Sequence, residues 1–142
     1  MKQLSKAIIS KYKLSTSSGT LYSSLTGGLW NSEAPANTAY PYAVFYLISD
    51  TPSHVMEGTF TDYKYEECLV QFSIYDDDTS QATIGGLYDT LTDLYDEASL
   101  SVSGYSTISF KREFSHAEKI NLENESYWQY VVQYRGLFER ST

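Results

Sequence analysis

Residues Ala39 to Ser49 read Ala-Tyr-Pro-Tyr-Ala-Val-Phe-Tyr-Leu-Ile-Ser, and this stretch decides the fold. Pro41 fixes its own backbone angle and lacks an amide hydrogen, so it belongs at the start of a strand. The segment Tyr42–Ile48 is almost continuously apolar, which predicts a strand buried on both faces. The sequence Asp50-Thr51-Pro52-Ser53 has the composition of a turn and is expected to end the strand.

Hydrophobic periodicity on either side of this segment predicts the remaining elements. The next strand is the clearest, because Cys68, Val70, Phe72 and Ile74 alternate with residues that face the other side. The expected elements are a helix at Gln3–Leu14, a helical turn at Thr20–Leu25, short strand residues at Leu29–Asn31, a strand at Tyr63–Asp78, a helix at Thr79–Ala98, and strands at Ser106–Phe114 and Tyr127–Phe138.

The principal elements follow the order α-β-β-α-β-β. Such an order predicts an α+β fold with a mainly antiparallel sheet flanked by two principal helices. A length of 142 residues suits one domain, residues 1–142, with a single core. The polar connection through His116 and Asn124 is expected to be a loop between the last two strands.

Charge and composition exclude several classes of function. The formal net charge of -8 argues against tight binding of a nucleic-acid backbone, which needs clustered Lys and Arg. Lys2, Lys6, Lys11 and Lys13 do gather near the N-terminus, where they are interpreted as a solvated helix face. No apolar segment approaches the roughly 20 residues that cross a bilayer, and no secretory signal is evident, so a cytoplasmic protein without membrane contact is expected.

No constellation of residues predicts catalysis. Cys68 is the sole cysteine and faces the predicted core, and neither His54 nor His116 has a sequence context that pairs it with a nucleophile. Gly27-Gly28 and Gly85-Gly86 lack the residues of a phosphate loop, and the second pair is expected to let its helix approach the sheet closely. We therefore predict neither an enzyme nor a bound cofactor.

Asp76, Asp77 and Asp78 form the one cluster that could hold a metal ion, because Mg²⁺ and Ca²⁺ prefer carboxylate oxygens. The spacing is not that of an EF-hand, since no glycine occupies the sixth position and Leu87 occupies the twelfth. Carboxylates at a helix N-terminus also cap it and interact favourably with its dipole. Capping is the preferred interpretation, and no metal site is assigned.

The best candidate for a functional surface is the segment Asp50–Asp62. Long loops in compact domains are disproportionately functional, and this one carries apolar side chains that a fully solvated loop does not need. Those side chains either fold back onto the core or contact another molecule. Tyrosines suit such contacts, and the chain has 14 of them. The predicted interface residues are Pro52, His54, Val55, Met56, Glu57, Phe60, Tyr130 and Tyr134.

The order of elements and several motifs together resemble one protein family. The motifs are Ala34-Pro35, Tyr40-Pro41-Tyr42, Ile48-Ser49-Asp50-Thr51-Pro52 and Val70-Gln71-Phe72-Ser73-Ile74-Tyr75, between amphipathic helices. With these features the chain, from Leu4 to about Phe138, resembles the tail-completion or tail-terminator proteins of long-tailed bacteriophages. The resemblance implies a hexameric homo-oligomeric ring on the head-proximal end of the tail tube, located in the neck of the virion and assembled in the host cytoplasm.

The same resemblance implies the partners. They are further copies of the chain, the major tail-tube protein and a head connector or head-closure protein, with DNA passing through the lumen without specific binding. The acidic composition agrees with such passage. Two alternatives remain: another head–tail connector or head-closure protein of the neck, and, more distantly, a metal-dependent enzyme that uses Asp76–Asp78.

Overall fold

The computed structural model describes residues 1–53 and 65–141, and these form an α+β fold, as predicted. The elements in chain order are α1 (Lys2–Leu14), α2 (Leu21–Ser24), β1 (Gly28–Asn31), β2 (Tyr42–Ser53), β3 (Tyr65–Asp76), α3 (Gln81–Tyr95), β4 (Tyr105–Asn121) and β5 (Ser126–Arg140). Within the described residues the strands form one five-stranded sheet in the order β1-β2-β3-β5-β4. Only β1 pairs in parallel, with β2, and the other pairs are antiparallel.

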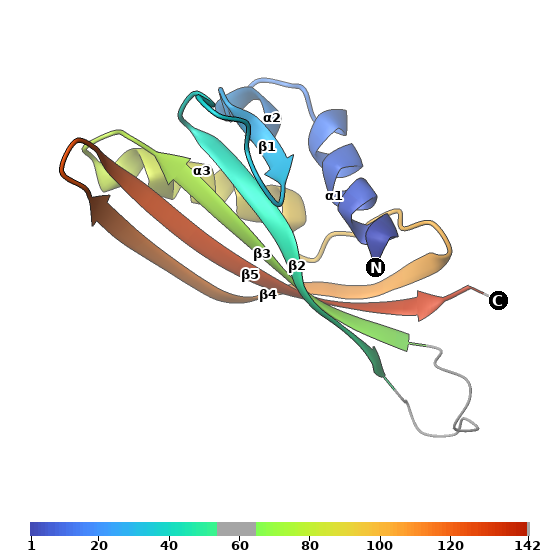
Figure 1. Ribbon diagram of the computed structural model, residues 1–142. Coiled ribbons are helices and arrows are strands. Elements are labelled where there is room, and N and C mark those ends of the chain that lie inside the picture. Colours follow the sequence, from blue (N-terminus) through green and yellow to red (C-terminus); the bar gives the residue numbers. More distant parts are fainter. Residues whose placement is uncertain (54–64, 142) are drawn as a thin grey trace.

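Helices α1, α2 and α3 lie on the same side of the sheet, and its other side is left without a helix (Figure 1). The core lies between these helices and the sheet. On α1 the apolar stripe Leu4, Ala7, Ile8 and Tyr12 is buried, which confirms the predicted amphipathic helix. Tyr95 of α3 is fully buried and its hydroxyl donates to the carbonyl of Ile8 at 2.8 Å, which fixes α3 against α1.

The sheet supplies the other half of the core through alternate residues of its central strands. Cys68, Val70, Phe72 and Ile74 of β3 have at most 1% of their surface exposed, as the alternating pattern predicted. Phe45 of β2, Phe72 and Val132 of β5 pair side by side across the sheet. The helix-covered face is therefore a continuous apolar layer.

Strand β2 differs from its prediction in two ways. Ala43 and Phe45 are buried, but Tyr46 on the opposite face is 39% exposed, so the strand is buried on one face only. The segment Asp50–Ser53 is strand, paired with β3, instead of the expected turn. Pro52 is tolerated there because β1 pairs only with Tyr42–Phe45, which leaves the far half of β2 at the edge of the sheet.

The last two strands form a hairpin that is longer than predicted. β4 continues through His116 to Asn121, so this segment is strand and not a loop. Most of its side chains are exposed, and a strand with both faces in solvent shows no apolar alternation. The tip of this hairpin extends to one end of the molecule, opposite the end at which β2 and β3 leave the sheet (Figure 1).

Helix α3 is shorter than predicted and begins after a cap. Ser80 is the N-cap, and its side chain accepts the amide hydrogen of Ala82 at 3.2 Å. Gly85 and Gly86 do not bring α3 close to the sheet, because a Cβ atom added at either position would meet nothing within 4 Å. That expectation was wrong.

Candidate interaction surface

The predicted interface residues lie in different settings. Pro52 is exposed on β2, while Tyr130 and Tyr134 belong to the helix-covered face of β5. The remaining residues of the predicted set lie outside the described residues: His54, Val55, Met56, Glu57 and Phe60. A surface that can bind a partner therefore has to be sought on the rest of the molecule.

Tyr134 is a core residue, which corrects its assignment to an interface. Its side chain has 0% of its surface exposed, and its hydroxyl donates to Oδ1 of Asp96 at 2.7 Å. Tyr130 is partly buried because its ring stacks on Tyr88 of α3, with centroids 4.3 Å apart and an interplanar angle of 7°. Both rings pack within their own chain, because the even-numbered residues of β5 point towards the helices.

The interpretation of the aspartates as helix caps was only partly right. The N-cap of α3 is Ser80, and of the three aspartates Asp78 supports the turn that leads into the helix. Asp78 accepts hydrogen bonds from the amide of Ser80 at 3.1 Å and from the hydroxyl of Thr83 at 2.7 Å. These bonds lower the pKa of Asp78. Asp76 instead turns inward, where burial raises the pKa of its carboxyl and Oδ2 has no partner. Among the described residues, no three His, Cys, Asp or Glu side chains converge as metal ligands would.

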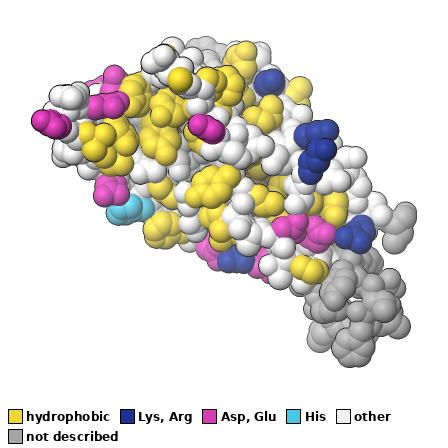
Figure 2. All heavy atoms as spheres, viewed as in Figure 1, with side chains coloured by type: hydrophobic (Ala, Val, Ile, Leu, Met, Phe, Trp, Pro, Cys, Tyr) yellow, Lys and Arg dark blue, Asp and Glu magenta, His cyan; other side chains and the backbone are white. Residues whose placement is uncertain are grey.

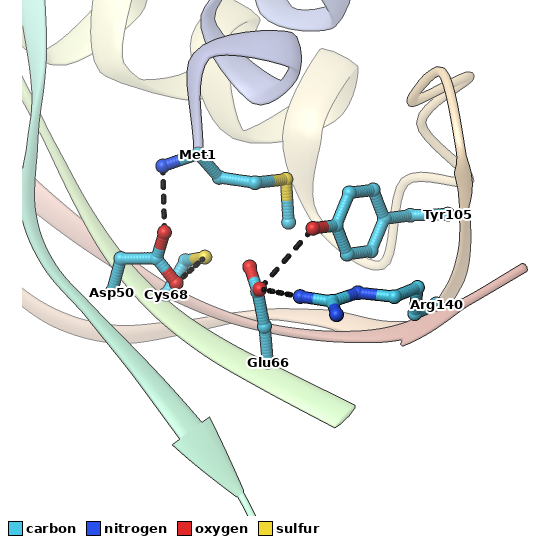
Figure 3. Close-up of polar contacts among 6 residues, drawn as sticks. All are labelled: Met1, Asp50, Glu66, Cys68, Tyr105 and Arg140. Carbon is cyan, nitrogen blue, oxygen red and sulfur yellow. Dashed lines mark hydrogen bonds and ion pairs between the residues drawn. The ribbon is translucent and has the colours of Figure 1, made fainter. Parts of the chain in front are cut away.

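Cys68 lies beside an ion pair at the N-terminus (Figure 3). The amino group of Met1 contacts Oδ2 of Asp50 at 2.6 Å, and the Cys68 thiol donates to Oδ1 of the same carboxylate at 3.6 Å. Burial, followed by the charge of Asp50, raises the pKa of the thiol to about 12. The thiol is thus protonated at neutral pH and is a poor nucleophile.

A second polar cluster lies next to the first and joins three strands (Figure 3). Oε1 of Glu66 on β3 accepts from the hydroxyl of Tyr105 on β4 at 3.1 Å and from Nη2 of Arg140 on β5 at 2.9 Å. The Arg140 guanidinium also lies over the Tyr105 ring, 6.0 Å from its centroid. These contacts hold the ends of β3, β4 and β5 together beneath α1, which is a structural role.

The sheet face that lacks helices is the surface that the sequence did not reveal, and we call it the open face. Residues of β2, β3, β5 and β4 alternate with the core residues and line it. Tyr46 and Phe114 are 39% and 49% exposed there. Figure 2 shows hydrophobic side chains spread over this side of the molecule. An exposed aromatic surface of this kind is typical of a contact with another macromolecule.

Four tyrosines make a closed cluster at one end of the open face. The rings of Tyr40 and Tyr42 are 5.5 Å apart, those of Tyr42 and Tyr75 are 5.0 Å apart, and Tyr127 contacts both Tyr75 and Tyr40 at 6.0 and 6.3 Å. Burial raises the pKa of Tyr40 and of Tyr42, so both hydroxyls stay protonated at neutral pH. The cluster offers aromatic faces and neutral hydroxyl groups to solvent.

A groove of about 770 Å³ opens between this cluster and the segment Ser32–Thr38, and we call it the tyrosine groove. Tyr40, Tyr42, Tyr46 and Tyr75 line it, together with the carboxylates of Glu33 and Glu125. Glu125, in the turn between β4 and β5, accepts from the Tyr40 hydroxyl at 2.6 Å and so fixes one wall. Among the described residues, no Lys or Arg lines this groove.

The open face changes character beyond the groove. Amide side chains cross its middle, where Gln133 donates to Gln71 at 3.0 Å. Further along, Arg135 pairs with Glu67 and, through Nε at 2.9 Å, with Glu113. The face thus runs from aromatic and acidic side chains at the tyrosine groove to a stretch in which Arg135 neutralises two carboxylates. No helix in the described part of the chain could cross a membrane.

Comparison with known proteins gives a likeness in structure only. The sequence matches no family of known proteins and no curated protein. A chain from the virion of a native gene transfer agent particle is similar with a TM-score of 0.68 and 15% identity, over 91% of this chain and 91% of that chain. A second solved structure, which carries no functional description, is similar with a TM-score of 0.53 and 9% identity, over 97% and 96% of the two chains. At these identities the likeness establishes a shared fold.

Proposed function

We propose that this chain is a structural virion protein that forms a ring on the head-proximal end of a phage tail tube. The fold shared with a chain of a gene transfer agent virion is the observation that carries the proposal, because it extends over nearly the whole of both chains. The resemblance in motifs to tail-terminator proteins points the same way. In this proposal the chain acts in the neck or tail of a virion and has no catalytic role.

The surface of the molecule supports a role in assembly. The described residues bring no set of metal ligands together, and the Cys68 thiol is held protonated. What the structure does offer is one sheet face covered by its own helices and one face with exposed aromatic side chains. A function of this kind works by association and requires no cofactor.

In the proposed role, copies of the chain bind one another and the last ring of tail-tube protein. The bound ring covers the tube end that would otherwise accept another tube subunit, and it presents its other side to a head connector or head-closure protein. DNA passes through the lumen. A net charge of -8 for each chain keeps the DNA from binding there.

The proposal is tested with the purified protein and the major tail-tube protein of the same virion. The mass of the full chain in solution is measured alone and with the tube protein, and tube lengths are measured by electron microscopy. A tail terminator forms a ring-sized oligomer at tube ends and stops further growth of the tube. The Tyr130→Phe variant, altered on the helix-covered face, serves as a control that should cap normally.

Two results contradict the proposal in different ways. Tubes that grow equally long with and without the protein exclude a terminator. Binding to the portal or connector without binding to tubes identifies the chain as a different neck protein, such as a head-closure protein.

A further inference from the structure

The exposed side of α1 carries a stripe of lysines. Lys2, Lys6 and Lys13 are all exposed, and spacings of four and seven residues put them on the same side of a helix. At 1.5 Å per residue the stripe is roughly 16 Å long. None of these lysines has an ion-pair partner among the described residues.

The other cations of the described chain are mostly engaged. Arg112, Arg135 and Arg140 each pair with a carboxylate, and Lys119 lies over the ring of Trp128 at 5.8 Å. The lysine stripe is therefore a concentration of unneutralised positive charge on a chain whose net charge is -8. Figure 2 shows Lys side chains over α1, at the upper right of the view, and further Lys and Arg side chains lower down beside acidic ones.

Apolar side chains adjoin the lysine stripe. Ile9 lies within it, and two neighbouring depressions that share Ile9 and Asn31 connect it to Tyr22 and Trp30. Tyr22 is 43% exposed and Trp30 is 37% exposed. An apolar centre beside a charged rim is the usual composition of a protein–protein contact.

The tyrosine groove has the opposite character. It carries Glu33 and Glu125, lacks a cation among its described lining residues, and is walled by tyrosine rings. An ammonium group on the face of a tyrosine ring is attracted by the ring quadrupole, and a nearby carboxylate adds to that attraction. The groove therefore suits a lysine-bearing, partly apolar surface.

We propose that the tyrosine groove of one copy receives the lysine stripe of α1 from a second copy of this chain. The contact is heterologous, because the two surfaces differ, and such a contact repeated with a closing rotation gives a ring. This inference deepens the proposed function and rests on its ring. It identifies which two surfaces of the chain meet around that ring.

The test uses two full-length variants with opposite charge changes. Lys6→Glu/Lys13→Glu reverses the stripe, and Glu33→Lys/Glu125→Lys reverses the groove. Like charges then face each other in each variant, and their juxtaposition costs several kcal/mol, so the dissociation constant should rise at least about 100-fold. Each variant alone is expected to sediment as a monomer at concentrations at which the unaltered chain is oligomeric.

Mixing the two variants gives the decisive result. The reversed stripe of one matches the reversed groove of the other, and the two unaltered surfaces match as well. The mixture should therefore recover the oligomer, with the two variants alternating around it. Native mass spectrometry can count the copies of each variant in that oligomer. Lys111→Glu, a reversal on β4 outside both surfaces, is the control and should leave the mass unchanged. If the double groove variant fails to fold, Glu33→Lys replaces it, because the Glu33 side chain has no described contact.

The outcomes separate this inference from the proposed function. If neither variant changes the mass of the oligomer, the pairing of groove and stripe is wrong. If the same variants still cap tubes, the proposed function stands. Loss of tube binding by the groove variant with an unchanged mass assigns the groove to the tube protein and also overturns the inference. A chain that stays monomeric with and without tube protein contradicts both proposals.

Discussion

Both the ring and the hydroxyl group of Tyr134 contribute to the stability of the folded chain. Its ring is fully buried, and its hydroxyl donates to Asp96, which also pairs with Arg112 at 3.2 Å. In Tyr134→Phe the Asp96 carboxylate keeps Arg112 as a partner, so we expect a loss of about 1 kcal/mol in the free energy of unfolding. Chemical denaturation measures this loss. Tyr130→Phe is the control and should be neutral within roughly 0.5 kcal/mol, since its hydroxyl has no described hydrogen bond.

The buried carboxyl of Asp76 should make the free energy of unfolding depend on pH. Burial raises the pKa of its carboxyl in the folded state, so the folded protein binds this proton more tightly than the unfolded chain does. The contribution of Asp76 to stability is therefore greatest below its unfolded pKa and decreases as pH rises through the folded value. Asp76→Asn should be more stable than the unaltered protein at neutral pH, and the difference should vanish in acid. Unfolding curves at several pH values test this, and an equal difference at every pH contradicts it.

At the scale of single elements, two glycines should respond oppositely to alanine. Gly86 lies inside α3 with open space around an added Cβ, so Gly86→Ala should stabilise the protein by about 0.5–1 kcal/mol through helix propensity. Gly136 lies on the core face of β5, where an added Cβ would be 2.6 Å from Cε2 of Phe138. Gly136→Ala should destabilise by roughly 1–3 kcal/mol, because Phe138 is fully buried. Melting temperatures compare the pair, and equal shifts would contradict the packing described.

The elements that could be predicted are those with one buried face. The stripe of α1, the alternation of β3 and the core side of β5 each repeat apolar residues with the period of their structure. The far half of β4 could not be found, because its side chains are exposed on both faces and carry no period. Asp50–Ser53 looked like a turn because its residue types are those of turns, whereas pairing with β3 made it strand.

For the molecule as a whole, sequence alone could not predict which side of the sheet stays uncovered. Val44, Tyr46 and Ile48 made β2 look buried on both faces, but the helices all pack on one side. The tyrosine groove combines three parts of the chain that are far apart in the sequence, namely residues 32–46, residues 73–75 and Glu125. Only the tertiary fold brings them together. The tyrosine content of the sequence predicted association, but it did not predict which part of the surface makes the contact.

The net charge of the whole molecule gives a further prediction. Tight contact with a DNA backbone needs clustered cations that release counterions, and in the proposed ring the lysine stripe is covered by a second copy. We therefore expect the assembled protein not to retard double-stranded DNA in a gel even at about 50 mM salt, where electrostatic binding is strong. The groove variant Glu33→Lys/Glu125→Lys is expected to be monomeric with its stripe uncovered. Because it exchanges two carboxylates for two ammonium groups, its formal net charge falls in magnitude from -8 to -4, and it should bind DNA better than the oligomer does. Retardation by the unaltered oligomer that weakens as salt is added contradicts passage of DNA without binding, because it would show cations still exposed on the ring.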